Sequence, residues 1–189
     1  MKSKVLALIL LCGAASLGAK VKLPALVGDN MILQQQTEVK LWGTAAPEAE
    51  VRVTPSWNGQ TMTCRADKDG GWTLAVETPA AGYTPYEITF DDGEKTTLKN
   101  ILIGEVWLAS GQSNMEMPLK GFAGCCIMNG ADDIIVSAEN KGVRMFTVPK
   151  HQTYELQTDC KGSWNISSIE TAPDFSATAY YFATSLSRA

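Results

Sequence analysis

One short stretch of the sequence could do nucleophilic chemistry, because it places a single serine directly after a run of apolar residues. Residues 103–118 read IGEVWLASGQSNMEMP, and Ser113 stands in the Gly-Gln-Ser-Asn turn. Residues 101–109 predict a strand that is covered on both faces of a sheet. A strand that ends in small residues brings the next side chain to the carboxyl edge of the sheet, where α/β folds build their sites. Ser113 is therefore the candidate nucleophile.

The same residues also fit a purely structural role. Ser113 and Glu116 have the S-x-x-E spacing of a capping box, in which the serine satisfies a backbone N–H at a helix start. The turn is not the G-x-S-x-G nucleophile elbow, because Met115 stands where that motif has glycine. If a helix starts here, the free N–H groups of its first turn could stabilise an oxyanion. Spacing alone leaves both roles open.

Residues 104–118 closely resemble the nucleophile block of the sialate O-acetylesterase family of SGNH-type hydrolases. Other segments resemble that family in the same order along the chain, namely DNMILQQ (29–35), LWG (41–43), DGGW (69–72), VRMFTVP (143–149) and FSA (175–177). Ala109 is a departure, because relatives often carry cysteine there. The resemblance implies that Ser113 attacks an acetyl ester on a sugar, with no metal and no organic cofactor. It does not indicate which acetylated sugar is the substrate.

The resemblance also implies a histidine base and an aspartate in an Asp-x-x-His element beyond Ala189, together with the rest of the oxyanion hole. A serine hydroxyl is a poor nucleophile unless a base accepts its proton. His151 is the only histidine of the 189 residues. It matches no histidine of the family's motif, and its polar surroundings indicate an exposed loop. We therefore expect this chain to be the N-terminal part of an esterase and to be inactive alone.

The elements that must position the serine fall into two predicted domains. Short alternating runs separated by turn residues fill residues 20–99 and predict an antiparallel, jelly-roll-like β-sandwich of about seven or eight strands. Asn58-Gly59 is a strong hairpin signal within it. Residues 100–189 are expected to be the incomplete start of an SGNH-type α/β/α hydrolase domain. Its predicted elements are strands at 101–109 and 143–148, a long loop over 120–140, and a helix after Pro173.

The first nineteen residues indicate a secretory signal peptide. Two lysines precede an uncharged apolar run and a group of small residues. The run is too short to span a bilayer, and Leu11 before Cys12 is bulky where a lipoprotein signal would have a small residue. We expect a periplasmic or secreted protein without stable membrane insertion. A net charge of −4 and the lack of a basic cluster argue against nucleic acid as a partner.

Several further side chains could take part in binding. Aromatic residues that could hold carbohydrate are Trp42, Trp57, Trp72 and Tyr83. Trp42 and Trp72 are expected to face the core, and Trp57 is the better surface candidate. In the predicted loop, Phe122 and Met128 could line a substrate pocket, whereas Asp132 and Asp133 indicate a solvated turn or a helix start.

Four cysteines follow the predicted signal peptide, at positions 64, 125, 126 and 160. In an oxidising compartment they permit three pairings, and buried free thiols are an equally good interpretation. Their spacing does not predict a zinc site. The function that competes with an esterase is a non-catalytic carbohydrate-binding protein, which keeps the β domain and a vestigial hydrolase strand.

Overall fold

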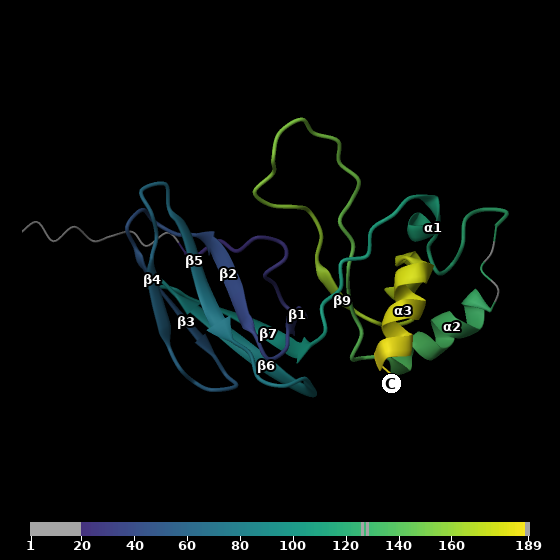
Figure 1. Cartoon of the computed structure of the whole chain (residues 1–189), viewed down its shortest axis with the longest axis horizontal. Coiled ribbons are helices and arrows are strands. Elements are labelled where there is room, and N and C mark those ends of the chain that lie inside the picture. The colour runs from purple at the N-terminus through teal and green to yellow at the C-terminus, as the bar shows by residue number, and fades with distance from the viewer. Residues whose placement is uncertain (1–19, 126, 128, 188–189) are drawn as a thin grey trace, which may run out of the picture.

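The computed structural model describes residues 20–125, 127 and 129–187 (Figure 1). The predicted signal peptide and Met128 lie outside the described residues. Strands make up most of the first half of the chain, and short helices with two short strands make up the second half (Figure 1). Within the described ranges, no helix is long and apolar enough to cross a membrane.

Two sheets build the strand-rich half. A five-stranded sheet has the order β1-β7-β6-β3-β4, and a two-stranded sheet pairs β2 with β5. The strands are β1 (Ile32–Gln34), β2 (Glu38–Thr44), β3 (Glu50–Pro55), β4 (Met62–Arg65), β5 (Gly71–Glu77), β6 (Gly82–Asp91) and β7 (Lys95–Gly104). The predicted strand-rich fold is confirmed, whereas the jelly-roll order and the α/β/α hydrolase layers stay predictions.

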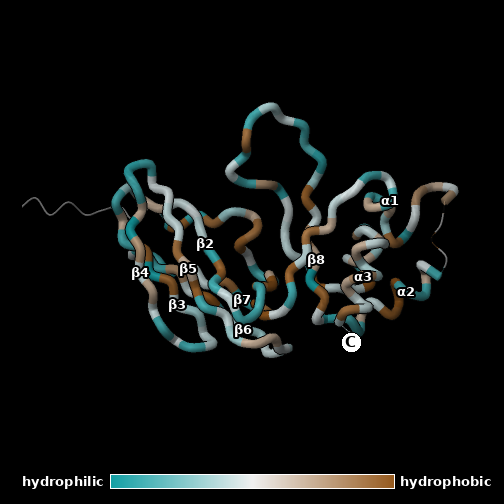
Figure 2. Tube along the Cα trace, viewed as in Figure 1, coloured by the Kyte–Doolittle hydropathy of each residue, from teal (hydrophilic) through white to brown (hydrophobic). Residues whose placement is uncertain are grey.

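The two sheets share one apolar core, which follows from alternation along the strands. In β5 the side chains of Trp72, Leu74 and Val76 are buried, while the residues between them are exposed. Ile88 and Phe90 of β6 face the same core and are fully buried. Each such large apolar side chain stabilises the fold by roughly 1.5–3 kcal/mol relative to an exposed position. Figure 2 shows hydrophobic and hydrophilic residues alternating along these strands.

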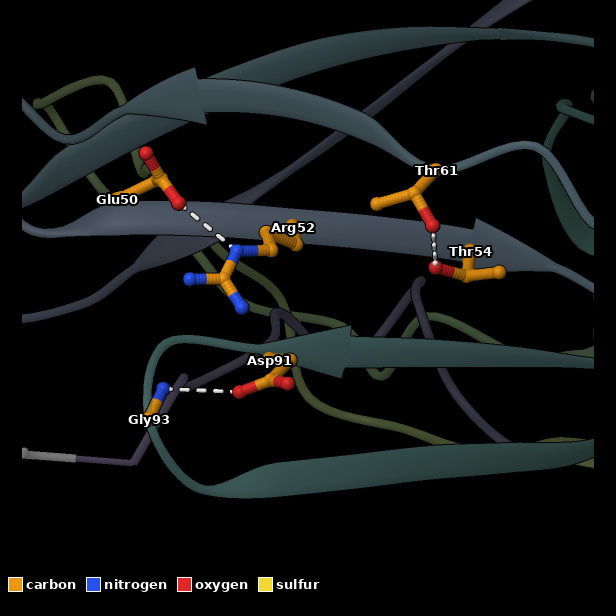
Figure 3. Close-up of polar contacts among 6 residues, drawn as sticks. All are labelled: Glu50, Arg52, Thr54, Thr61, Asp91 and Gly93. Carbon is orange, nitrogen blue, oxygen red and sulfur yellow. Dashed lines mark hydrogen bonds and ion pairs between the residues drawn. The ribbon is translucent and has the colours of Figure 1, made fainter.

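The outer face of β3 is polar. Arg52 donates from Nε to Glu50 Oε1 at 2.8 Å, and the hydroxyls of Thr54 and Thr61 lie 2.8 Å apart (Figure 3). In the turn after β6, Asp91 Oδ1 accepts the backbone N–H of Gly93 at 2.9 Å (Figure 3). These contacts lie at exposed positions, so each contributes little to stability. Their effect is to keep this face hydrated while the opposite face packs.

The hairpin prediction is confirmed, and the prediction of a wholly antiparallel sheet is wrong at one pair. Strands β3 and β4 pair in antiparallel register around the Asn58-Gly59 turn, where Gly59 adopts a φ of 65°. Strand β1, however, runs parallel to β7, with Gln34 opposite Gly104. Strand β1 is the outermost strand of the sheet and is not joined to β7 by a hairpin. The two strands can therefore run in the same direction, and their carboxyl ends lie together.

The strand predicted over 101–109 ends early. Strand β7 crosses the expected domain boundary at residues 99 and 100 and stops at Gly104, so its buried part belongs to the first sheet. Residues 105–112 form no strand, and Trp107 and Leu108 are 60% and 93% exposed. No described strand pairs with this segment. Without a partner strand, the backbone N–H and C=O groups of residues 105–112 cannot form the hydrogen bonds of a sheet. The segment is therefore not a strand, although its sequence is apolar.

The second half consists of short elements packed around its own small core. They are α1 (Ser113–Glu116), α2 (Gly130–Val136), η1 (Ser137–Glu139), β8 (Arg144–Phe146), β9 (Trp164–Ile166), η2 (Ala172–Asp174) and α3 (Ala177–Ser187). The core side chains are Leu119, Val143, Met145, Ala172, Ala177 and Tyr180. A largely hydrophilic excursion joins β8 to β9 (Figure 2), and its Asp159 accepts the backbone N–H of Ala25 at 3.0 Å.

Three sequence predictions for this half have different outcomes. The helix expected after Pro173 is confirmed as α3. The predicted strand at 143–148 is present as β8, but it pairs in antiparallel register with β9 and not with residues 101–109. The long loop expected over 120–140 is wrong at its end, because α2 and η1 occupy 130–139. Asp132 and Asp133 lie in the first turn of α2, as the helix-start interpretation predicted.

Candidate functional site

Ser113 lies at the first position of α1, exposed to solvent. The residue that caps this helix is Gln112, whose carbonyl oxygen accepts the N–H groups of Met115 and Glu116 at 2.9 and 3.0 Å. No side-chain cap is formed. The capping-box interpretation of Ser113 is therefore wrong, because the helix starts one residue too early for that geometry. The serine hydroxyl therefore does not cap the helix.

The two polar groups that an acyl-transfer nucleophile uses are both unengaged. In the described part of the chain, neither Ser113 Oγ nor the Ser113 backbone N–H has a hydrogen-bond partner. A free hydroxyl can attack a carbonyl carbon, and a free backbone N–H can donate to the oxyanion that forms. These groups meet two of the three needs of serine acyl transfer, and the third is a base.

The start of α3 holds the serine turn in place. Thr178 donates from Oγ1 to the carbonyl oxygen of Asn114 at 3.1 Å, and the Ser176 hydroxyl contacts Met115 Sδ at 3.3 Å. The Ala177 N–H donates to the Met117 carbonyl oxygen at 2.8 Å. The FSA segment of the sequence resemblance thus contacts the residues that follow Ser113. Sequence reasoning did not assign this segment a role.

An ion pair links α1 to the segment that contains the lone histidine. Lys150 Nζ lies 2.7 Å from Glu116 Oε2, so the excursion after β8 passes beside the helix that starts at Ser113. His151 itself is exposed and makes no hydrogen bond or ion pair with any described residue. Its neighbour Lys150 thus contacts α1, but His151 makes no hydrogen bond with Ser113.

A polar cluster sits at the edge where β1 and β7 both end. Glu105 accepts N–H groups from the side-chain amides of Gln34 and Gln35 at 2.9 and 2.7 Å. Gln34 Oε1 in turn accepts the Val106 backbone N–H at 2.9 Å. The amide donors, Gln35 first, lower the pKa of Glu105 because they stabilise its charged form. This cluster fixes the direction in which the chain leaves β7 toward Ser113.

A second chain of polar contacts connects three segments that are distant in sequence. Asn100 donates from Nδ2 to Asn30 Oδ1 at 2.7 Å and accepts from Arg144 Nη2 at 3.1 Å. Arg144 Nε and Nη1 are buried without a partner, and burial lowers the pKa of this guanidinium. Sequence reasoning missed this chain. The only signal was that Asn30 and Arg144 both fall in segments that resemble the family.

Two cavities are relevant to binding. One, of about 320 Å³, is mostly apolar and lies where the first sheet meets α3, lined among others by Tyr83, Trp107, Arg144 and Leu186. The other, of about 720 Å³, is more polar and lies on the strand-rich half beside Trp42. Ser113 lines neither of these cavities, and neither does Phe122, which is 52% exposed.

The remaining candidate residues pack against the core or form hydrogen bonds within the fold. Trp72 is buried as expected, whereas Trp57 packs against the core, with its Nε1 donating to the Glu77 carbonyl oxygen, and is not a free surface ring. Asp133 accepts the Tyr181 hydroxyl at 2.6 Å. Burial, followed by this bond, raises the pKa of Tyr181 to about 12. In the described ranges, no group of three or more His, Cys, Asp and Glu residues could hold a metal ion.

The described cysteines include no disulfide. Cys64, Cys125 and Cys160 carry free thiols, and Cys126 lies outside the described residues. Burial raises the pKa of the Cys64 thiol, which lowers its thiolate content and hence its reactivity. Cys64 fits the buried-thiol interpretation.

Comparison with known proteins shows similarity to acetylesterases. No family model matches the chain. Sialate O-acetylesterase of Rattus norvegicus is 27% identical over 175 residues, which are 85% of this chain and 31% of the relative. The Homo sapiens protein of the same name is 29% identical over 161 residues, which are 79% of this chain and 29% of the relative. The chain thus spans less than a third of the length of these curated relatives.

A solved structure gives the same indication. The crystal structure of a carbohydrate acetylesterase from Xanthomonas citri is 32% identical and superimposes with a TM-score of 0.80. The match covers 88% of this chain and 37% of that chain. Both halves described above therefore take part in the match.

Proposed function

We propose, from its membership of the sialate O-acetylesterase family, that this chain carries the nucleophilic serine of a carbohydrate esterase. Its acetylesterase relatives support the reaction class. The observation that carries the assignment to one residue is the geometry of Ser113, which is exposed at the start of α1 with its hydroxyl and backbone N–H both unengaged. The substrate in this proposal is an acetylated sugar or glycan.

The reaction would proceed by two acyl transfers. Ser113 Oγ attacks the acetyl carbonyl carbon while a base takes its proton, and the Ser113 backbone N–H donates to the oxyanion. The sugar oxygen leaves with the proton returned by the base, and the acetyl group stays on Ser113. Water then attacks the acyl-enzyme, acetate is released and the serine is regenerated. The chemistry needs neither a metal nor an organic cofactor.

The base in this proposal belongs to the part of the family's length that these 189 residues do not span. His151 is a poor alternative, because it is exposed and lacks any described partner that could orient it. We therefore propose that the 189-residue chain alone does not turn over substrate. We also propose a periplasmic or secreted location, supported by the composition of residues 1–19.

The test compares acetate release from 4-nitrophenyl acetate by four proteins. These are the 189-residue chain, its His151→Ala variant, the longer product of the reading frame where one is encoded, and that product with Ser113→Ala. We expect only the unchanged longer product to exceed the buffer rate. Ester hydrolysis that survives Ser113→Ala would refute the nucleophile assignment. Hydrolysis by the short chain that disappears with His151→Ala would instead place the base at His151.

A non-catalytic carbohydrate-binding protein is the second candidate function, favoured by the polar groove beside Trp42. It predicts sugar binding without acetate release from any form of the protein. A longer product that binds sugar but does not hydrolyse acetyl esters would establish it over the esterase.

A further inference from the structure

A polar groove lies on the strand-rich half, away from the serine turn. Its floor is the outer face of the β2–β5 sheet, where Trp42 and Thr73 are cross-strand neighbours. Three other segments complete it, namely residues 22–24, the turn that contains Asp67 and Asp69, and the tip of the excursion at Thr158 and Asp159. The cavity volume of about 720 Å³ lies within the range of ligand sites.

Hydrogen bonds fix the walls of this groove. Asp159 Oδ1 accepts the Ala25 backbone N–H at 3.0 Å, which ties the tip of the excursion to the segment before β1. In the opposite wall, Asp67 Oδ1 accepts the N–H groups of Asp69 and Gly71 at 2.9 and 2.8 Å. Trp164 Nε1 donates to the Leu26 carbonyl oxygen at 2.9 Å, close to the first of these ties. The groove is thus assembled from segments about 130 residues apart in sequence, each held by a specific contact.

The groove presents aromatic surface. Adjacent residues of a strand face opposite sides, and Leu41 is the fully buried one, so Trp42 faces outward. The expectation that Trp42 is a core residue holds only in part, because the half-buried ring packs against the core cluster and also lines the groove. Beneath it, Trp72 is 4% exposed, and its Nε1 is buried without a hydrogen-bond partner. Because Trp72 packs into the core and its Nε1 is buried, this N–H does not reach a ligand in the groove, and Trp42 supplies the aromatic surface.

Charged side chains of both signs also line the groove. Lys22 and Arg65 are the cations, and Asp67, Asp69 and Asp159 are the carboxylates. None of these five takes part in any of the ion pairs found among the described residues. Threonine hydroxyls at positions 44, 73 and 158 add groups that both donate and accept. The groove therefore offers donors and acceptors with no large net charge.

We propose that this groove binds a neutral oligosaccharide, at a site separate from the serine turn. A simple anion would meet three carboxylates, and a simple cation would meet Lys22 and Arg65. An apolar ligand would remove charged groups from water without compensating bonds. A polyhydroxylated, uncharged ligand satisfies donors and acceptors together, and the indole of Trp42 offers an apolar face for its ring carbons. That combination is met by a sugar chain.

The experiment measures binding of cellohexaose, xylohexaose and maltohexaose to the 189-residue chain by isothermal titration calorimetry, with 3′-sialyllactose as an anionic probe. The protein carries Ser113→Ala, so that binding is separated from any hydrolysis. We expect at least one neutral hexasaccharide to bind and the anionic probe to bind more weakly. Failure of all three neutral sugars at millimolar concentration, or preference for the anionic probe, would overturn the proposal.

Two variants and one control locate the binding site. Asp69→Lys places a longer side chain of opposite charge in the groove, and the Asp69 carboxylate makes no described hydrogen bond on which folding depends. We expect Asp69→Lys and Trp42→Ala each to weaken binding about tenfold or more, equivalent to at least about 1.4 kcal/mol. Tyr154→Ala, which removes a fully exposed ring that does not line the groove, should bind like the parent. Unchanged binding in Asp69→Lys, with circular dichroism showing a folded protein, would place the sugar elsewhere.

Discussion

Gln34 and Glu105 lie side by side where two parallel strands end, joined by a hydrogen bond of 2.9 Å between side chains 71 residues apart in sequence. Gln35 donates to the other carboxylate oxygen at 2.7 Å. The chain turns from β7 toward Ser113 at this point. The direction of the serine segment is therefore set by the DNMILQQ segment near the start of the chain as well as by the residues around the serine.

The Glu105 contacts predict a pH dependence of stability. Since both amides favour the charged carboxylate, its pKa in the folded protein lies below the ordinary value of 4.5. The stabilisation is therefore present above pH 4.5 and is lost as the pH falls through the folded pKa. We expect Glu105→Gln to lower the Tm at pH 7, and the difference from the parent to shrink between pH 5 and pH 3. Thermal unfolding across that range measures it, and a difference that does not change with pH would contradict it.

The hydroxyl of Tyr181 joins α3 to α2 through Asp133 at 2.6 Å. Tyr181→Phe should lower the free energy of unfolding by about 1 kcal/mol, because a hydrogen bond to a charged group is lost at a partly buried position. In the parent, the raised pKa of about 12 implies stability that is present below pH 10 and lost between pH 10 and 12. Urea unfolding measures the first effect, with Tyr154→Phe, a fully exposed ring, as control. Equal losses in both variants would show that the contact is not stabilising.

Gly43 has no room for a side chain. A Cβ there would lie 2.4 Å from the Lys22 carbonyl oxygen and 2.9 Å from Trp72 Cζ2. Gly43→Ala should therefore destabilise the fold by about 1–3 kcal/mol through overpacking. Gly82→Ala is the matched control, because a Cβ there meets nothing within 4 Å in another strand of the same half. Urea midpoints that fall equally for both variants would rule out the steric explanation.

Ser176 stands directly before α3, where its Oγ accepts the Ala179 backbone N–H at 3.3 Å. Ser176→Ala should cost about 1 kcal/mol by removing this helix cap, and it should also loosen the contact with Met115 beside the serine turn. Ser185→Ala, an exposed position within the same helix, should change stability by less than about 0.5 kcal/mol. Hydrogen exchange at residues 113–117 would detect the loosening. Exchange that is unchanged in a destabilised Ser176→Ala protein would confine the effect to the helix.

Much of the strand-rich half could be predicted from sequence, because its alternation, turn residues and burial agree. Strands β2, β3 and β5 fall within residues 20–99, where alternating runs predicted strands, and Asn58-Gly59 forms its turn. Trp42 was expected to face the core, but adjacent residues of a strand face opposite sides, and Leu41 beside it is the fully buried one. Strict use of the two-residue period of a strand would have placed Trp42 on the outer face of the sheet.

The serine turn could be recognised from the sequence, whereas the structure of the residues around it could not be predicted. The apolar residues Val106, Trp107 and Leu108 have the composition of a buried strand, but composition does not supply the neighbouring strand that such a ladder needs. The Asn30–Asn100–Arg144 contacts join positions that no local pattern relates. Long-range polar contacts of this kind depend on the tertiary arrangement, so a single sequence gives no spacing from which to infer them.

The parallel pairing of β1 with β7 sets an order for folding. The partners Ile32 and Leu102 are about seventy residues apart, so a growing chain cannot complete the first sheet until residue 104 has been synthesised. Until then β1 has no partner strand, and its apolar residues Ile32 and Leu33 stay exposed to water. Closing so long a loop costs entropy before any contact compensates for it. We therefore expect the first half to fold slowly, and a chain cut before Gly104 to lose the pairing of its first strand as well as part of its last.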